Sequence, residues 1–277
     1  MQLSKQTLYQ LAFNVLGVLI ALVIVGYIVR SLVFTETEPA CAARYPAPHR
    51  FALTSNGAQL SAIELQARAG IPEWGVLENA AVVTDASAPT GTALEIKLAD
   101  VPDTEASGRP ANGVDFRWEP PGLASASSAC LSYSVWLPDE FRFGDGGVLP
   151  GILGSQIVDE ADNSTFGTRL LWQGDGRGHF NVASAGRNYR DASGGTFPLP
   201  VGRWLRIEQE LVLNAPGEAN GVGRMWIDGK LAAEDLRLAY RTDAAGRLAG
   251  VLADIGYVQP TAEPGVLRLS PFELAWK

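Results

Sequence analysis

The sequence predicts an all-β fold, an antiparallel jelly-roll sandwich, preceded by one N-terminal transmembrane helix. Short alternating or β-rich runs, separated by Gly, Pro, Asn and Asp, fill the chain from Phe51 onward and predict the sandwich. A long apolar run near the N-terminus predicts the helix. We therefore divide the 277 residues into an N-terminal tail (1–7), a transmembrane signal anchor (8–34), a linker (35–50) and one jelly-roll domain (51–277).

The anchor is predicted from the segment LYQLAFNVLGVLIALVIVGYIVRSLVF, residues 8–34. Residues 15–29 carry no charge, and the run matches the roughly 20 residues of a bilayer-spanning helix. A cleaved signal peptide is the alternative, but its apolar core would be only about 7–15 residues long. The A-x-A-like site at residues 40–42 lies beyond Arg30 and two glutamates, which favours an uncleaved anchor. We expect a single-pass membrane protein whose C-terminal domain lies in the periplasm or the extracellular space.

Composition argues against a nucleic-acid partner, a metal and a cofactor. The chain has 30 Asp and Glu against 22 Lys and Arg, a net charge of −8, whereas nucleic acid requires a basic face. Only His49 and His179 occur, which excludes a multi-histidine metal site, and no glycine-rich phosphate loop is present. The oxygen-rich run at residues 159–165 lacks EF-hand spacing, so a solvated loop is favoured over a calcium site.

The two cysteines, Cys41 and Cys130, are disulfide candidates. Cys41 follows the predicted anchor, and Cys130 opens the strand-like run CLSYSVW. An oxidising compartment would allow a bridge that attaches the linker to the domain. Two unpaired thiols are the equal alternative.

The domain is interpreted as a series of strands joined by tight turns. Asn220-Gly221 and Asp228-Gly229 are hairpin-type dipeptides. Many short strands without a good helix are typical of a sandwich or jelly roll. The best strand candidates are residues 93–99, 114–120, 130–138, 168–173, 179–184, 203–214, 223–236, 253–259 and 267–276.

Three motifs occur in an order that resembles a known family. They are YSVWLPDEFRFGDGGVLPGILG (133–154), FGTRLLWQGDGRGHFNVAS (166–184) and GRWLRIEQELVLNAPGEANGVGRMWIDGK (202–230). In this order they are similar to polysaccharide lyases of the alginate and glucuronan lyase kind. The resemblance is best over residues 131–230, and it implies a concanavalin-like β-jelly roll. It also implies cleavage of uronic-acid polymers by β-elimination.

The same resemblance locates the catalytic positions and shows what this chain carries there. Elimination requires a cation or donor at the uronate carboxylate, a base for the C5 proton and an acid for the leaving oxygen. Where the family has lysine in Gly-Gly-Lys-Leu-Pro-Gly, this chain has Val148. The family's Ser-x-Arg corresponds to Gly167 and Arg169, and its Tyr-x-Tyr to Asn181 and Ala183. The resemblance therefore implies that the arginine is kept while the lysine, the serine and both tyrosines are absent.

These positions define the predicted site. The carbohydrate-groove candidates are Val148, Arg169, Trp172, Asn181 and Ala183. No catalytic residue is assigned. An active protein would use Arg169, His179 and Tyr189, with His179 as base and Tyr189 as acid, although an ordinary loop with a surface histidine is favoured.

The predicted function is that of a non-catalytic, lyase-like accessory or scaffolding subunit of a membrane complex. Its partner would be an integral membrane protein that packs against the N-terminal helix through the polar and small residues Gln10, Asn14, Gly17, Ala21 and Gly26. The alternative is an anchored lyase or carbohydrate-binding protein that acts on envelope uronic-acid glycans, with a polysaccharide as its ligand.

Overall fold

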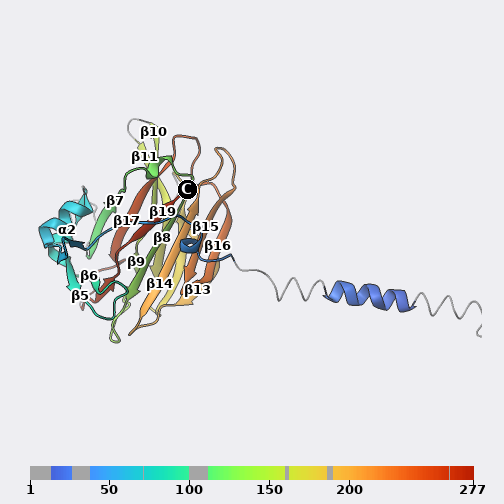
Figure 1. The fold of residues 1–277 in the computed structure, drawn as a ribbon, viewed down its shortest axis with the longest axis horizontal. Coiled ribbons are helices and arrows are strands. Elements are labelled where there is room, and N and C mark those ends of the chain that lie inside the picture. Colours follow the sequence, from blue (N-terminus) through green and yellow to red (C-terminus); the bar gives the residue numbers. More distant parts are fainter. Residues whose placement is uncertain are drawn as a thin grey trace, which may run out of the picture. The chain divides into compact units, whose positions relative to one another are not determined.

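The computed structural model describes residues 14–26, 38–70, 72–99, 112–159, 162–185, 190–261 and 263–277. The chain forms two compact units, Met1–Glu38 and Pro39–Lys277 (Figure 1). In the first unit, residues 14–26 form a helix whose apolar side chains are exposed. No helix within the described residues has both the length and the apolar character needed to cross a membrane. The rest of the predicted anchor, including its ends at residues 8 and 34, lies outside the described residues.

The second unit is an antiparallel β-sandwich, which confirms the predicted fold class. One sheet has nine strands in the order β16-β15-β14-β8-β18-β6-β5, and β19 pairs with both β8 and β1. These strands are β16 (Lys230–Leu238), β15 (Gly221–Ile227), β14 (Trp204–Val212), β8 (Ser128–Trp136), β18 (Val266–Leu269), β6 (Thr92–Lys97), β5 (Ala80–Thr84), β19 (Glu273–Trp276) and β1 (His49–Arg50).

The other large sheet has eight strands and carries the predicted site. Its order is β13-β12-β11-β10-β17-β7-β4, and β9 pairs with both β11 and β17. The strands are β13 (Arg190–Pro198), β12 (Arg177–Ala183), β11 (Asp162–Trp172), β10 (Gly151–Asp159), β17 (Arg247–Tyr257), β7 (Val114–Trp118), β4 (Glu73–Trp74) and β9 (Gly147–Leu149). A separate hairpin joins β2 (Thr54–Ser55) to β3 (Ala58–Gln59).

Period-two alternation decides which side chains fill the space between the sheets. In β11, Phe166, Thr168 and Leu170 are fully buried, whereas Arg169 and Leu171 between and after them are partly exposed. Alternate residues of β12 and β17 are buried in the same core. Each strand of the eight-stranded sheet therefore presents one set of side chains to the core and the other to the face turned away from it, here called the outer face.

Short helices and turns complete the domain, and one of them contradicts the expectation that no good helix follows Phe51. Helix α2 (Ala62–Ala69) begins at Ser61, whose hydroxyl accepts a hydrogen bond from the Glu64 amide, and Glu64 bonds back to the Ser61 amide. This capping box satisfies otherwise unpaired amides of the first turn, so the pattern Ser-x-x-Glu was the missed signal. Figure 1 shows α2 beside β5 and β7. The remaining short elements are α3 (Val76–Asn79), η1 (Cys41–Ala43) and η2 (Leu123–Ser125).

The predicted domain boundary at Phe51 also requires correction. The compact unit begins at Pro39, and Cys41 within the predicted linker is fully buried. The described part of the linker is therefore part of the domain's surface layer, because it packs on the nine-stranded sheet through η1.

Candidate functional site

Close packing requires glycine at several positions of the loop between β8 and β10. Gly146 has φ of 115°, and a Cβ there would lie 2.6 Å from the carbonyl oxygen of Trp172. A Cβ on Gly147 would overlap the indole of Trp172, and one on Gly151 would overlap the carbonyl group of Thr168. The glycines of this loop are therefore explained by the close approach of β11 to the loop backbone, without a catalytic role.

The end of this loop is fixed from the opposite sheet. The carbonyl oxygen of Pro150 accepts a hydrogen bond from Gln209 Nε2 at 2.7 Å and another from the Tyr133 hydroxyl at 3.0 Å. Gln209 Oε1 in turn accepts from the Thr168 hydroxyl at 2.7 Å. Burial raises the pKa of Tyr133, so the phenol stays protonated as a donor. These contacts satisfy the buried polar groups and hold the β9–β10 corner at the centre of the sheet.

Val148 lies at this centre, on the outer face. It pairs with Leu171 of β11 and with Gly256 of β17, and its neighbour Leu149 is in the core. Its side chain is 8% exposed. The position that the family resemblance assigns to a lysine is therefore occupied by an uncharged, nearly buried side chain.

Five polar side chains cross the outer face from β13 to β7. Asn181 of β12 pairs with Asp191 of β13 on one side and with Arg169 of β11 on the other. Across the β9–β10 corner, Asp254 of β17 pairs with Asp115 of β7. We call Asp191, Asn181, Arg169, Asp254 and Asp115 the polar row. At its β7 end the partner of Asp115 on β4 is the half-buried Trp74.

An ion pair joins the two halves of the polar row. Arg169 Nη1 lies 3.1 Å from Asp254 Oδ2, and the two side chains are 25% and 22% exposed. Burial raises the pKa of Asp254 to about 6, with the Arg169 charge opposing this and the neighbouring Asp115 charge adding to it. Asp254 is therefore largely ionised at neutral pH, and its charge is placed against the only arginine of the row.

His179 lies on the same face, directly across from Leu171. Its Nε2 is 3.2 Å from Asp191 Oδ1, which also accepts a hydrogen bond from Asn181 Nδ2 at 2.9 Å. His179 Nδ1 and Asn181 Oδ1 are both buried and have no hydrogen-bond partner among the described residues. Asp191 thus orients two neighbouring side chains, each of which keeps one polar atom for another contact.

Comparison with known proteins identifies the family. Residues 87–257 match the model of the family described as polysaccharide lyase 14. The chain belongs to the polysaccharide lyase 14 family. No curated protein matches it in sequence.

Solved structures of polysaccharide lyases share the fold. An alginate lyase of polysaccharide lyase family 14 from Aplysia kurodai is 17% identical, with a TM-score of 0.60 over 74% of this chain and 90% of its own. The alginate lyase vAL-1 from Chlorella virus is 16% identical, with a TM-score of 0.60 over 72% and 89%. The endo-β-1,4-glucuronan lyase of Trichoderma reesei is 11% identical, with a TM-score of 0.53 over 76% and 90%. At these identities the likeness shows the fold alone.

The structure of this polysaccharide lyase 14 family member brings most of the predicted groove residues together. Val148, Arg169, Asn181 and Ala183 lie on the outer face, as does His179. Trp172 does not, because it stands three residues from Arg169 and so faces the core, where it is 3% exposed. Its indole Nε1 donates to the carbonyl oxygen of Phe143 at 2.9 Å, so its assignment to the groove is corrected to a role in packing.

Two of the predicted features lie outside the described residues, and three residues of the site were not predicted from the sequence. Tyr189, the proposed acid, falls outside the described residues, as do the side chains at the tip of the oxygen-rich run 159–165. The missed residues are the three carboxylates of the polar row, Asp115, Asp191 and Asp254. A charged residue inside an otherwise apolar strand, as in residues 253–257, was the available signal for Asp254.

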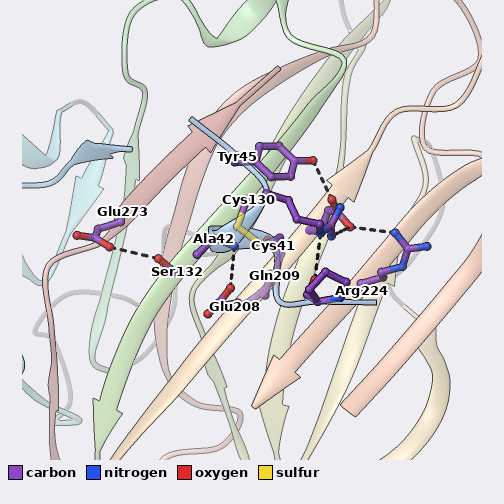
Figure 2. Close-up of a disulfide and its surroundings, with 12 residues drawn as sticks. Cys41, Ala42, Tyr45, Cys130, Ser132, Glu208, Gln209, Arg224 and Glu273 are labelled. Carbon is purple, nitrogen blue, oxygen red and sulfur yellow. Dashed lines mark hydrogen bonds and ion pairs between the residues drawn. A yellow bond between two sulfur atoms is a disulfide. The ribbon is translucent and has the colours of Figure 1, made fainter. Parts of the chain in front are cut away.

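The structure pairs Cys41 and Cys130 in a disulfide on the other sheet (Figure 2). It fixes residues 39–45, here called the N-terminal strap, over β14 and β8. The two half-cystines pack against Trp226, which is fully buried. Among the described residues, the group that could offer three metal ligands is Cys41, Cys130 and Glu208, and the disulfide uses both of its sulfur atoms.

The strap also covers two carboxylates. Glu210, with a side chain 2% exposed, accepts hydrogen bonds from Arg44 Nη2 and the Tyr45 hydroxyl, each at 2.9 Å. Arg224 Nη1 adds a third contact at 3.1 Å. Glu208 accepts from the Ala42 amide at 2.9 Å (Figure 2). A nearly buried charge requires several such partners, so the strap and the sheet stabilise each other.

Proposed function

We propose that this polysaccharide lyase 14 domain binds glycan on its outer face without cleaving it, and that it serves as a membrane-tethered accessory subunit. The observation that carries the proposal is the polar row, in which the arginine kept from the family pattern is paired with the protein's own Asp254 at 3.1 Å. Val148 stands where the resemblance implies a lysine. Alginate and glucuronan are the polymers named for the structural relatives, and they are the first polymers to test for cleavage.

The chemistry of the row supports binding more than elimination. Elimination requires a positive charge at the sugar carboxylate and a proton acid at the leaving oxygen. Within the described polar row, three of five residues are carboxylates and none is a lysine or a tyrosine. Carboxylates and an amide are suitable hydrogen-bond partners for sugar hydroxyls. The half-buried Trp74 at the end of the row adds an aromatic surface next to them.

Binding and cleavage can be separated with the full-length protein in detergent. We expect saturable binding of a glycan by calorimetry, and no ultraviolet absorbance from unsaturated uronate when alginate or glucuronan is added. Asn181→Ala should weaken binding, because it removes the hydrogen bond from Asn181 Nδ2 that holds the Asp191 carboxylate in place on the face. The matched control is Asn220→Ala, the same side-chain deletion in the turn before β15. Equal binding by the wild type and Asn181→Ala would contradict the proposed site.

A second candidate function is residual lyase activity with His179 as the base. The observation that favours it is the contact between His179 Nε2 and Asp191 Oδ1 at 3.2 Å, because a carboxylate on one ring nitrogen orients the imidazole. His179→Gln would then abolish formation of unsaturated uronate, while Asn220→Ala would leave it unchanged. If the wild type makes no unsaturated product, this candidate is wrong.

The tether and the partner are part of the same proposal. The apolar run 8–34 supports membrane attachment, and the Cys41–Cys130 disulfide fits an oxidising compartment such as the periplasm or the extracellular space. Purification in mild detergent from the native membrane should return a stoichiometric integral membrane protein. Exchange of residues 8–34 for an unrelated anchor should abolish that association. A protein that purifies alone would contradict the accessory role.

A further inference from the structure

We propose that Asp254 is a specificity-determining residue that occupies the position of a sugar carboxylate at Arg169. With Asp254 in place, the outer face would select neutral glycans over uronic-acid glycans. This inference rests on the proposed glycan-binding role of that face. It reassigns the arginine that the family resemblance keeps, from the recognition of a ligand's charge to the recognition of the protein's own carboxylate.

The contact spans the sheet where a ligand would cross it. Arg169 is on β11 and Asp254 on β17, with the β9–β10 corner between them. Val148, Pro150 and Gly151 supply no charged side chain at this corner, so the long Arg169 side chain meets Asp254 across an uncharged strip. Both remain about one quarter exposed, which leaves the pair reachable from solvent.

The surroundings make Asp254 a replaceable partner for Arg169. On β7, its cross-strand neighbour Asp115 carries a like charge, and the next outward residue, Arg117, pairs with Leu252 rather than with Asp254. β11 contributes Arg169. Burial and the Asp115 charge raise the pKa of Asp254 to about 6. Ionisation of Asp254 in this place therefore costs more free energy than ionisation of an aspartate in water. An incoming uronate would have to displace a carboxylate that is already in position, which weakens its binding.

A purely structural ion pair is the competing explanation, and it makes a different prediction. Asp254→Asn keeps the shape of the side chain and removes the carboxylate charge that pairs with Arg169 at 3.1 Å. If Asp254 only stabilises the fold, this variant should bind no better to any sugar. If Asp254 imitates a sugar carboxylate, the variant should gain affinity for uronic-acid oligosaccharides, because a ligand carboxylate then restores the missing pair.

The test uses two tetrasaccharides of one length, mannuronate and its neutral counterpart mannose, with full-length protein in detergent. At about pH 7.5, where an acid with a pKa of about 6 is ionised, we expect Asp254→Asn to bind the mannuronate at least about ten-fold tighter than the wild type. Affinity for the neutral sugar should change less than about two-fold. The control is Arg169→Gln combined with Asp254→Asn, in which the gain should disappear. Thermal unfolding of each variant checks that it is folded.

Each outcome decides the inference. An equal gain in the double variant would overturn it, because the effect would then come from general charge and not from Arg169. No gain in a folded Asp254→Asn that still binds the neutral sugar would overturn it while leaving the proposed glycan binding intact. If no sugar binds to the wild type or the variants, the proposed function and the inference are both wrong.

Discussion

Removal of the disulfide should cost several kcal/mol, since the bridge closes a long segment of chain. Cys41 and Cys130 are 89 residues apart. The loop-entropy relation gives about 4.6 kcal/mol for a closed loop of that size. The change is Cys41→Ala with Cys130→Ala, which removes both sulfur atoms and leaves no free thiol. We expect the free energy of unfolding to fall by about this amount, because the unfolded chain regains the conformations that the bridge excluded.

Guanidinium unfolding measures this loss, with circular dichroism for the sandwich and with tryptophan fluorescence, to which Trp226 beneath the strap contributes. The slope with denaturant should rise, since the unfolded chain becomes less compact. Reduction should move the oxidised wild type to the midpoint of the variant and leave the variant unchanged. A loss below about 1 kcal/mol would refute the reasoning. So would a fluorescence change long before the loss of circular dichroism, which would mean that the domain does not unfold in one cooperative transition.

Three further predictions concern the sheet that carries the site. Gly151→Ala should prevent folding or cost more than about 3 kcal/mol, measured by thermal unfolding, because its Cβ would overlap the carbonyl group of Thr168; a stable variant would contradict this. Tyr133→Phe should cost only about 1 kcal/mol in chemical unfolding, because Pro150 keeps its bond from Gln209 at 2.7 Å; a cost above about 3 kcal/mol would show that the two bonds are not equivalent. Since the pKa of Asp254 is raised from 3.8 to about 6, the protonated acid stabilises the fold below pH 3.8, and this contribution is lost as pH rises through about 6. The wild type should therefore lose up to about 3 kcal/mol of unfolding free energy relative to Asp254→Asn over that window, and parallel pH profiles would contradict it.

Much of the sandwich could be predicted from the sequence, because its signal is local. Alternating runs and turn dipeptides mark β6, β7 and β12 within a few residues of their observed bounds. The run 223–236 covers most of both β15 and β16, and the run 253–259 begins well inside β17. Which alternate residues of a strand face the core was harder to predict than where the strand lies. In β14 the core side is Leu205, Ile207, Gln209 and Leu211, whereas the side chain of Trp204 points outward and is partly exposed. Trp204 lies on the outward side with Arg206, Glu208 and Glu210, and the strap covers the two glutamates on that side.

The site was only partly predictable, for a physical reason. Arg169 and Asn181 are close in sequence and belong to neighbouring strands of a hairpin, so a motif could place both. Asp254 is 85 residues from Arg169, and its contact depends on the order of strands in the sheet. Strand order follows from the packing of the whole domain, which no local pattern of residues encodes. The same limit hid the contact between the strap and Glu210, 166 residues away from Arg44.

The most direct test of the account is a paired measurement on purified full-length protein: calorimetric binding of glycan, followed by ultraviolet detection of unsaturated uronate in the same samples. The account predicts saturable binding that Asn181→Ala weakens, with no unsaturated product from alginate or glucuronan. Product that disappears in His179→Gln would contradict it and make this member of the polysaccharide lyase 14 family an active lyase.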